Sequence, residues 1–243
     1  MGKAPPEGTR QAEASFPEAK GERESRREKG WTALPEPRGQ YASGAEMNEE
    51  YFFDRVRRAV FGGRLTAKQV DGMTRILDFR DYSWPSMSDD ELAYLLATVV
   101  HETAFEMQPI RERGGQKYLQ SKPYFPFYGR GLVQITWERN YKLFKVDPAD
   151  KALEWPIALD ICFRGMIKGM FTGKKLADYI VPGKKPNYVG ARQIINGTDR
   201  AKLVAHYALA FQDALRQAKQ IPVPQAPAAQ KVSGQKAASK GAA

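Results

Sequence analysis

The segment that decides the fold is Ser88-Asp-Asp-Glu-Leu-Ala-Tyr-Leu-Leu-Ala-Thr-Val-Val-His-Glu-Thr103. Ser88 and Glu91 have the spacing of a capping box, the reciprocal side-chain pair that starts a helix. The apolar side chains that follow, from Leu92 to Val100, recur at helical spacing. This run is the longest apolar candidate in the sequence, and it is far shorter than the roughly 20 residues that cross a bilayer. The segment therefore predicts the most apolar helix of the fold, and not a membrane span.

Similar start and stop signals predict helices on both sides of this segment. Asn48 has the side chain of a helix cap, and Gly62-Gly63 ends the helix that follows it. Thr66 and Gln69 repeat the capping-box spacing, and a last helix is expected to begin near Asp199. The apolar residues expected to face the core from these helices are Phe52, Phe53, Val56, Val60, Val70, Met73, Leu77, Leu203, Val204, Tyr207, Phe211 and Leu215.

Strand signals are weak and confined to a short hairpin near 129–136, so the predicted fold class is mainly α. The foldable part is 47–221, and no internal repeat is visible in it. Residues 1–46 hold five prolines and almost no aliphatic side chains, and residues 222–243 form an Ala/Pro/Lys tail. Both ends are predicted to be disordered, because they cannot bury enough apolar surface to offset the loss of chain entropy. Met47, where the composition changes, is a candidate start of translation that N-terminal sequencing of the native protein would test.

The chain is basic, and its excess positive charge lies mostly in the foldable part. It has 38 Lys and Arg against 28 Asp and Glu. Residues 1–46 hold eight of each sign, whereas residues 47–221 hold 27 basic and 20 acidic residues. A basic body suits a polyanionic partner, such as nucleic acid, an anionic membrane face or a bacterial cell wall. A surface that is merely soluble is the alternative that charge alone leaves open.

The composition excludes several classes of protein. The single cysteine, Cys162, excludes an internal disulfide and argues against a disulfide-stapled secreted scaffold. Together with two histidines, His101 and His206, it leaves too few soft ligands for a structural zinc site, so we expect neither a metal nor a cofactor. The first thirty residues are polar, with no apolar stretch behind a basic start, so no secretory signal peptide is predicted. The chain is therefore expected to be made in the cytoplasm.

Glu102, at the C-terminal end of the most apolar predicted helix, is a candidate general acid. Its own helix is expected to half-bury it, and burial disfavours the charged form of a carboxyl group. A general acid at neutral pH needs such a group. A capping or salt-bridged glutamate is the alternative. A metalloprotease is excluded, because the pattern His-Glu-x-x-His fails at Phe105.

Glu112 is a second candidate, ten residues further on in Pro109-Ile-Arg-Glu-Arg-Gly-Gly115. Its proline and paired glycines predict a loop. Arg111 and Arg113 flank the carboxylate, and nearby positive charge favours its ionised form. One protonated and one ionised carboxyl group is the division of labour of a glycoside hydrolase. A solvated, charged loop is the alternative.

The segment Phe127-Tyr-Gly-Arg-Gly-Leu-Val-Gln-Ile-Thr-Trp-Glu-Arg-Asn-Tyr141 has side chains that suit a sugar polymer, which is polar at its edges and apolar on its faces. Its neutral donors and acceptors are Gln134, Thr136, Asn140 and Tyr141, and its flat rings are Tyr128 and Trp137. A packed hairpin with polar groups on its surface is the alternative. In Ile194-Ile-Asn-Gly197, Asn196 is expected to point toward the core, where its amide needs a partner.

Taken together, these residues resemble glycoside hydrolase family 19, the plant-type chitinases and their bacterial and phage endolysin relatives. The resemblance covers residues 49–216 and rests on four blocks in order: His101-Glu-Thr, Arg111-Glu-Arg-Gly, Tyr128-Gly-Arg-Gly with Gln134-Ile-Thr, and Ile194-Ile-Asn-Gly. Phe163-Arg-Gly-Met and the segment 171–179 are more similar to the compact phage and bacterial members than to the secreted plant enzymes.

The resemblance implies a lysozyme-like, bilobed catalytic domain with a substrate cleft, and a mechanism that inverts the anomeric carbon. It implies that Glu102 is the general acid, that Glu112 is the general base and that Thr136 helps to position the attacking water. The residues expected to bind substrate are His101, Tyr128, Arg130, Gln134, Asn140, Tyr141 and Asn196. The sequence departs from the family pattern at Ala104, Phe127 and Arg139. These departures weaken the expectation of a chitin substrate more than that of catalysis.

Three functions fit this interpretation. The first is a peptidoglycan hydrolase that cuts the β-1,4 backbone between N-acetylated sugars in cell-wall catabolism, as an endolysin does. The second is a chitinase with the same chemistry, and the third is a wall-binding module without catalysis. Both carboxylates are present, which disfavours the third, and the basic body and missing export signal favour the first over the second. We expect a monomer with a polysaccharide partner, acting on the wall after release, without nucleic acid or membrane insertion.

Overall fold

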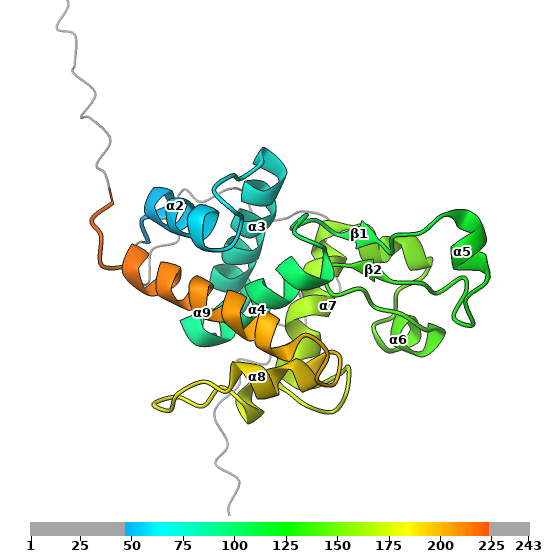
Figure 1. Cartoon of the computed structure of the whole chain (residues 1–243). Coiled ribbons are helices and arrows are strands. Elements are labelled where there is room, and N and C mark those ends of the chain that lie inside the picture. Colours follow the sequence, from blue (N-terminus) through cyan, green and yellow to red (C-terminus); the bar gives the residue numbers. More distant parts are fainter. Residues whose placement is uncertain (1–46, 224–243) are drawn as a thin grey trace, which may run out of the picture. The chain divides into compact units, whose positions relative to one another are not determined.

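The computed structural model describes residues 47–223, and this part is mainly α-helical (Figure 1). Residues 1–46 and 224–243, which include almost all of the predicted disorder, lie outside the described residues. The α-helices are α2 (Glu49–Ala59), α3 (Ala67–Ser83), α4 (Asp89–Glu102), α5 (Gln116–Gln120), α6 (Glu138–Leu143), α7 (Trp155–Lys168), α8 (Tyr188–Ala191) and α9 (Ala201–Ala218). The strands are β1 (Ile110–Arg111) and β2 (Arg130–Gly131), and the 3-10 helices are η1 (Ala149–Leu153), η2 (Leu176–Asp178) and η3 (Arg192–Ile194).

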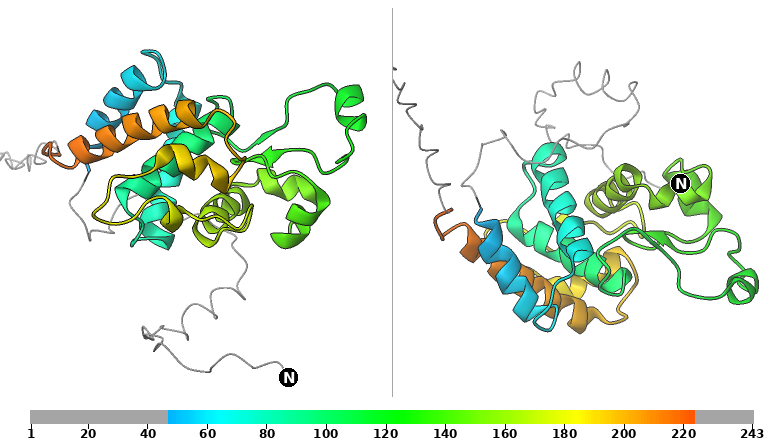
Figure 2. Two further views of the ribbon diagram at one scale, coloured as in Figure 1. Left: turned by 60° about the horizontal axis from the view of Figure 1, so that its bottom comes forward. Right: turned by 90° about the horizontal axis from the view of Figure 1, so that it is seen from above.

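Helix α4 forms the centre of the core. Every residue from Leu92 to Val100 is buried, and burial stabilises the fold by about 1.5–3 kcal/mol for each large apolar side chain. The predicted capping box starts the helix: Ser88 Oγ accepts from the N–H of Glu91, and Glu91 Oε2 accepts from the N–H of Ser88. Helix α4 packs most extensively against α9, and it also contacts α3 and α7 (Figure 2). No helix within residues 47–223 combines the length and the apolar character needed to cross a bilayer.

The predicted starts of α2 and α3 are confirmed. Asn48 Oδ1 accepts a hydrogen bond from the N–H of Tyr51 at the start of α2. Thr66 and Gln69 form the complete capping box of α3. Helix α2 lies against α9, where the Tyr51 hydroxyl donates to Gln217 Oε1 at 2.8 Å. Helices α2 and α4 therefore both pack against α9.

Helix α9 begins at Ala201, close to the predicted start. Val204, Phe211 and Leu215 are fully buried, as expected from their helical spacing. The prediction is wrong for Leu203, which is 38% exposed. Successive residues of a helix point about 100° apart, so the neighbour of a core-facing valine lies beside the buried stripe rather than on it.

The two strands described in residues 47–223 form one small antiparallel sheet, with Ile110 opposite Gly131 and Arg111 opposite Arg130. The predicted hairpin contains β2 and a single bridge between Arg130 and Ile135, but the prediction missed β1. A two-residue strand has no alternation of polar and apolar residues that a sequence pattern could reveal. The pairing matters for the site, because it places the residue that follows β1 beside the residue that precedes β2.

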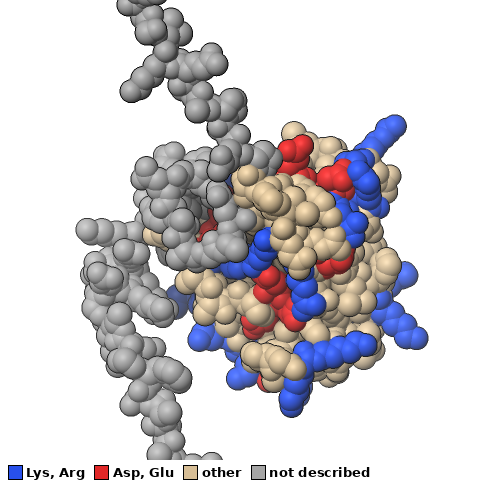
Figure 3. Space-filling view, turned by 90° about the vertical axis from the view of Figure 1, so that its left-hand side faces the viewer, with Lys and Arg blue, Asp and Glu red and all other residues tan. Residues whose placement is uncertain are grey.

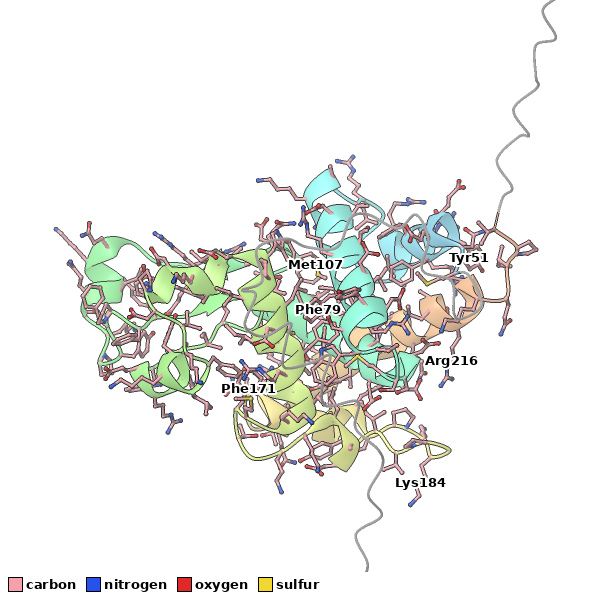
Figure 4. The ribbon with its side chains drawn as sticks, turned by 180° about the vertical axis from the view of Figure 1, so that it is seen from behind. Tyr51, Phe79, Met107, Phe171, Lys184 and Arg216 are labelled. Atoms are coloured by element: carbon pink, nitrogen blue, oxygen red, sulfur yellow. The ribbon has the colours of Figure 1, made fainter. Side chains whose placement is uncertain are left out.

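Helix α7 carries none of the start signals that predicted the other long helices. Glu154 makes no side-chain capping bond, and the one local start signal is Pro156 in the first turn. The helix is held by burial: the Phe163 ring packs edge-on against Phe79 of α3, with 5.0 Å between the ring centres. Phe79 is labelled in Figure 4. It ends at Gly169, whose φ of 70° is a left-handed conformation that glycine adopts without strain.

Candidate active site

Glu102 is the last residue of α4, and a buried arginine holds its carboxylate. Arg192 Nη1 donates to Glu102 Oε1 at 2.6 Å, and the exposed fractions of the two side chains are 1% for Arg192 and 15% for Glu102. Within residues 47–223, no hydrogen bond reaches Oε2 of this carboxylate. Glu102 is therefore partly buried, as expected, but its surroundings are not the apolar ones that the sequence suggests.

Arg192 is the partner of Glu102 that the sequence reasoning missed. Its Nε donates to the carbonyl oxygen of Asp199 at 2.8 Å, so one guanidinium joins η3, the turn before α9 and the end of α4. A buried charge needs a charged or hydrogen-bonded partner. The signal that could have identified Arg192 is its place just before the apolar pair Ile194-Ile195, where a charged side chain is hard to keep in water.

His101 precedes Glu102 and is partly buried. Burial lowers the pKa of His101, and the positive charge of Arg192 lowers it further, while the negative charge of Glu102 opposes both effects. The imidazole is therefore mainly neutral at pH 7. A neutral imidazole donates one hydrogen bond and accepts another. This property suits the expected contact of His101 with a sugar hydroxyl.

The backbone that follows Glu102 is strained. Ala104, Phe105 and Met107 have φ angles of 46°, 69° and 55°, in a region that residues other than glycine rarely adopt. This loop lies directly on α3, because a Cβ atom on Gly72 would stand 1.8 Å from the carbonyl oxygen of Met107. Backbone strain persists only where the surrounding structure enforces it, and it concentrates at functional sites. The strained residues lie in the loop that joins the two candidate carboxylates.

Glu112 directly follows β1, and both of its carboxylate oxygens accept hydrogen bonds. The Tyr124 hydroxyl donates to Oε1 at 2.7 Å, and the backbone N–H of Gly129 donates to Oε2 at 2.9 Å. The Glu112 N–H in turn donates to the Gly129 carbonyl at 2.7 Å. The hydrogen bond to Glu112 raises the pKa of Tyr124 to about 12, so the phenol keeps its proton at neutral pH. These contacts hold Glu112 as a hydrogen-bond acceptor, the role of an ionised carboxylate.

The arginines that flank Glu112 in the sequence face other carboxylates. Arg111 Nη2 lies 2.6 Å from Asp150 Oδ2, and Arg113 Nη2 lies 3.2 Å from Glu106 Oε1. The sequence suggested that these two guanidinium groups act on Glu112. The groups that bond Glu112 are instead an uncharged phenol and a backbone amide.

Gln134, Thr136 and Asn140 form a chain of hydrogen bonds within the segment that follows β2. Gln134 Nε2 donates to the carbonyl oxygens of Ile110 at 2.9 Å and of Gly131 at 3.0 Å. Thr136 Oγ1 donates to the Gln134 carbonyl at 3.0 Å, and Asn140 Nδ2 donates to the Thr136 carbonyl at 2.7 Å. The amide and hydroxyl groups that we expected to bind substrate or water therefore also hold the strands and the loop together.

Gly129 brings Gln134 and Glu112 into the same place. A Cβ atom on Gly129 would stand 2.9 Å from Gln134 Oε1 and 3.4 Å from the Glu112 Cβ. Gln134 and Trp137 also have positive φ angles, 51° and 73°. Strained backbone thus recurs beside the second candidate carboxylate, as it does after the first.

Arg130 and Tyr141 are buried and bonded inside the same segment. Arg130 is 5% exposed; its Nε donates to Asp150 at 2.7 Å, and its Nη1 donates to the Tyr141 hydroxyl at 3.0 Å. Tyr141 is 1% exposed and donates to the Tyr128 carbonyl at 2.6 Å. The Tyr128 ring, which is partly exposed, lies 3.7 Å from the Arg130 guanidinium. Of these three predicted substrate-binding residues, Arg130 and Tyr141 have mainly structural partners, and Tyr128 presents a ring to solvent.

Asn196 is exposed, so the expectation that it points toward the core is wrong. The residue of this motif that fills the core is Ile194, with no exposed surface, and η3 ends there. The chain then turns, with the Asn196 N–H donating to the Arg192 carbonyl at 3.0 Å and Gly197 at a φ of 53°. This turn places Asn196 on the solvent side, two residues after Ile194, where its amide is free to meet a ligand.

The predicted site residues thus fall into two groups. One contains Glu102 and His101, and the other contains Glu112 and Gln134. No three His, Cys, Asp or Glu side chains within residues 47–223 converge in a way that would hold a metal ion. No known family model matches the chain, and no curated protein shows a significant match to its sequence.

Proposed function

We propose that the chain is an inverting glycoside hydrolase that cleaves β-1,4 linkages in N-acetylhexosamine polymers, with bacterial peptidoglycan as its substrate. The observation that carries the proposal is the pair Glu102 and Glu112: both are partly buried, and each is fixed by a different set of donors. The resemblance of the four sequence blocks to glycoside hydrolase family 19 supports the same assignment.

Glu102 is the general acid in this proposal. When Glu102 is protonated, the bond from Arg192 to Oε1 leaves Oε2 as the oxygen that carries the proton to the leaving glycosidic oxygen. The carboxylate ends a helix whose residues are buried over nearly its whole length, so its position is rigid. A rigid support is what a catalytic group needs, because small errors in its placement cost large factors in rate.

Glu112 is the general base. Each of its oxygens accepts one hydrogen bond, and a carboxylate oxygen has a second lone pair that can accept a proton from water. That water then attacks the anomeric carbon from the face opposite the leaving group. Thr136, held through the Gln134 carbonyl, is proposed to orient the water.

Two alternatives follow from the same residues. Chitin is the alternative substrate, because the four sequence blocks also resemble those of chitinases. A wall-binding module without catalysis is the second alternative, and the two carboxylates would then have a structural role only. The substrate and the catalysis can be tested in one assay.

The assay incubates the full chain with purified peptidoglycan and, separately, with a chitin hexamer, and identifies new reducing ends by mass spectrometry. We expect muramic or glucosamine ends from peptidoglycan, and their yield should fall by about two to four orders of magnitude in Glu102→Gln. Glu106→Gln is the matched control, because Glu106 is an exposed carboxylate whose partner is the exposed Arg113. A folded Glu102→Gln protein with more than about a tenth of the activity would contradict the acid assignment. Cleavage of neither polymer by the folded, unmutated chain would contradict the hydrolase itself.

A further inference from the structure

The segment that carries Glu112 holds most of the net charge of the described part. Residues 110–153 contain nine Lys and Arg against four Asp and Glu, whereas the other described residues contain 18 against 16. On the face seen in Figure 3, from the side of α2 and α9, basic and acidic side chains lie next to one another. Arg55 pairs there with Asp213, and Arg57 pairs with Asp54.

The acidic residues of 110–153 leave several cations unmatched. Asp150 accepts from both Arg111 and Arg130, and Glu138 pairs with Lys142 at 2.8 Å. Five cations of this segment have no anionic partner within residues 47–223: Lys117, Lys122, Arg139, Lys145 and Lys151. An unpaired surface cation keeps its full capacity to bond an anionic ligand.

Flat aromatic rings are exposed in the same segment. Three side chains are exposed by nearly half, namely Tyr118 at 48%, Phe125 at 45% and Trp137 at 46%. Lys122 Nζ lies 3.9 Å from the centre of the Tyr118 ring. Trp137 meets the Tyr124 ring edge-on at 5.5 Å, and Tyr124 is the donor to Glu112. Trp137 is therefore one ring away from the proposed general base.

We propose that Lys117, Tyr118, Lys122, Trp137 and Arg139, the α5–α6 surface, bind a glycan that carries carboxylate groups. This inference rests on the proposed function and names the chemistry that selects its substrate. Aromatic rings pack on the apolar faces of sugar rings, while exposed cations pair with carboxylates. A neutral polymer such as chitin could pack on the rings but has no carboxylates to pair with the cations. Peptidoglycan would match both, through the carboxylates of its stem peptides and of those lactyl groups that carry no peptide.

The test measures binding in the Glu102→Gln background, where the strand is not consumed. The ligands are soluble peptidoglycan strands, the same strands after carbodiimide coupling of their carboxylates to methylamine, and a single-stranded oligonucleotide. The triple variant Lys117→Gln/Lys122→Gln/Arg139→Gln should bind the charged strands about tenfold more weakly, the sum expected of three exposed ion pairs. Its affinity for the methylamine-coupled strands should change less than about twofold, because those strands have no carboxylates to pair.

The matched control is Lys174→Gln/Lys184→Gln/Lys185→Gln. It removes the same charge from exposed positions on the chain after α7. One of them, Lys184, is labelled in Figure 4 away from α5. This triple variant should bind the charged strands within about twofold of the parent, since a general charge effect is weak at physiological salt.

Three results would overturn the inference: equal weakening by both triple variants, equal affinity for charged and coupled strands, or tighter binding of the oligonucleotide than of any strand. The oligonucleotide is included because single-stranded nucleic acid also binds cations and rings. Cleavage of the strands by the unmutated chain is measured in parallel. Selective binding without cleavage contradicts the proposed function alone, and cleavage without selective binding contradicts this inference alone.

Discussion

Arg192 and Glu102 are 90 residues apart in the sequence and form an ion pair with 2.6 Å between Nη1 and Oε1. The same guanidinium bonds the carbonyl oxygen of Asp199. The end of the most buried helix is thereby tied to the turn from which α9 begins. The position of the proposed acid depends on this tie, because among residues 47–223 Arg192 makes the one side-chain hydrogen bond to its carboxylate.

Arg192→Met should destabilise the fold by about 3 kcal/mol. Removing one partner of a buried ion pair typically costs about 3–5 kcal/mol, because the other charge is left unpaired. We expect the lower end of this range, since Glu102 keeps an exposed fraction of 15% and is partly solvated. Urea unfolding followed by circular dichroism would measure the change in the free energy of unfolding.

The direct coupling can be separated from a general loss of packing. In Arg192→Met/Glu102→Gln the unpaired charge is gone, so the cost of the double variant should be smaller than the sum of the two single costs. Strictly additive costs would show that the two residues do not stabilise one another. Arg200→Met is the control, because Arg200 is an exposed arginine at the start of α9, and its replacement should change stability by less than about 0.5 kcal/mol.

Local signals were sufficient for the starts of α2, α3 and α4. Their caps depend on residues at most three positions apart, as in Thr66 with Gln69 and Ser88 with Glu91. Helix α7 has no such cap, and it is held by contacts such as Phe163 with Phe79, which belong to the tertiary structure. A sequence pattern reveals a helix when its own residues start it, and it misses one that its neighbours stabilise.

The same difference between local signals and tertiary contacts explains which site residues could be predicted from the sequence. Glu102 and Glu112 were found because the sequence predicts their local structure: a helix end for Glu102 and a loop bounded by Pro and Gly for Glu112. Their partners Arg192, Tyr124 and Gly129 were not found, because no spacing rule links a carboxylate to a donor that only the fold brings near. The arginines that are adjacent to Glu112 in the sequence proved to bond elsewhere.

Gly72→Ala should destabilise the fold by at least about 1–3 kcal/mol, the usual cost of overpacking. In an isolated helix this change would stabilise by up to about 1 kcal/mol. Here the added Cβ would stand 1.8 Å from the Met107 carbonyl oxygen, so the clash outweighs the helix propensity. The loop after Glu102 would have to move, and we expect lost activity together with a lower melting temperature. Gly115→Ala is the control, because its new Cβ meets nothing within 4 Å. A comparable loss of stability in this variant would contradict the clash as the cause.

His101→Gln should flatten the dependence of stability on pH in mild acid. Burial and Arg192 lower the pKa of His101 in the folded chain, opposed by Glu102; Asp199 and Arg200 add weaker effects of opposite sign. The unfolded chain therefore binds the proton more tightly. Stability should be fully present above the unfolded pKa of about 6.5 and should fall as the pH drops below it toward the folded pKa. Thermal unfolding between pH 7 and pH 5 measures the slope, and His206→Gln, at an exposed position of α9, should leave it unchanged.

Cleavage of a β-1,4 linkage should release the α anomer first. In a retaining enzyme Glu112 would bond to the anomeric carbon itself, whereas as a base it takes a proton from a water and keeps its bonds to the Tyr124 hydroxyl and the Gly129 N–H. As a base, Glu112 needs only a further lone pair toward a water, and inverting enzymes leave room for that water between the two carboxyl groups. Proton NMR of the fresh hydrolysate, recorded before the anomers equilibrate, distinguishes the two mechanisms. If the β anomer appears first, Glu112 is a nucleophile and not a base.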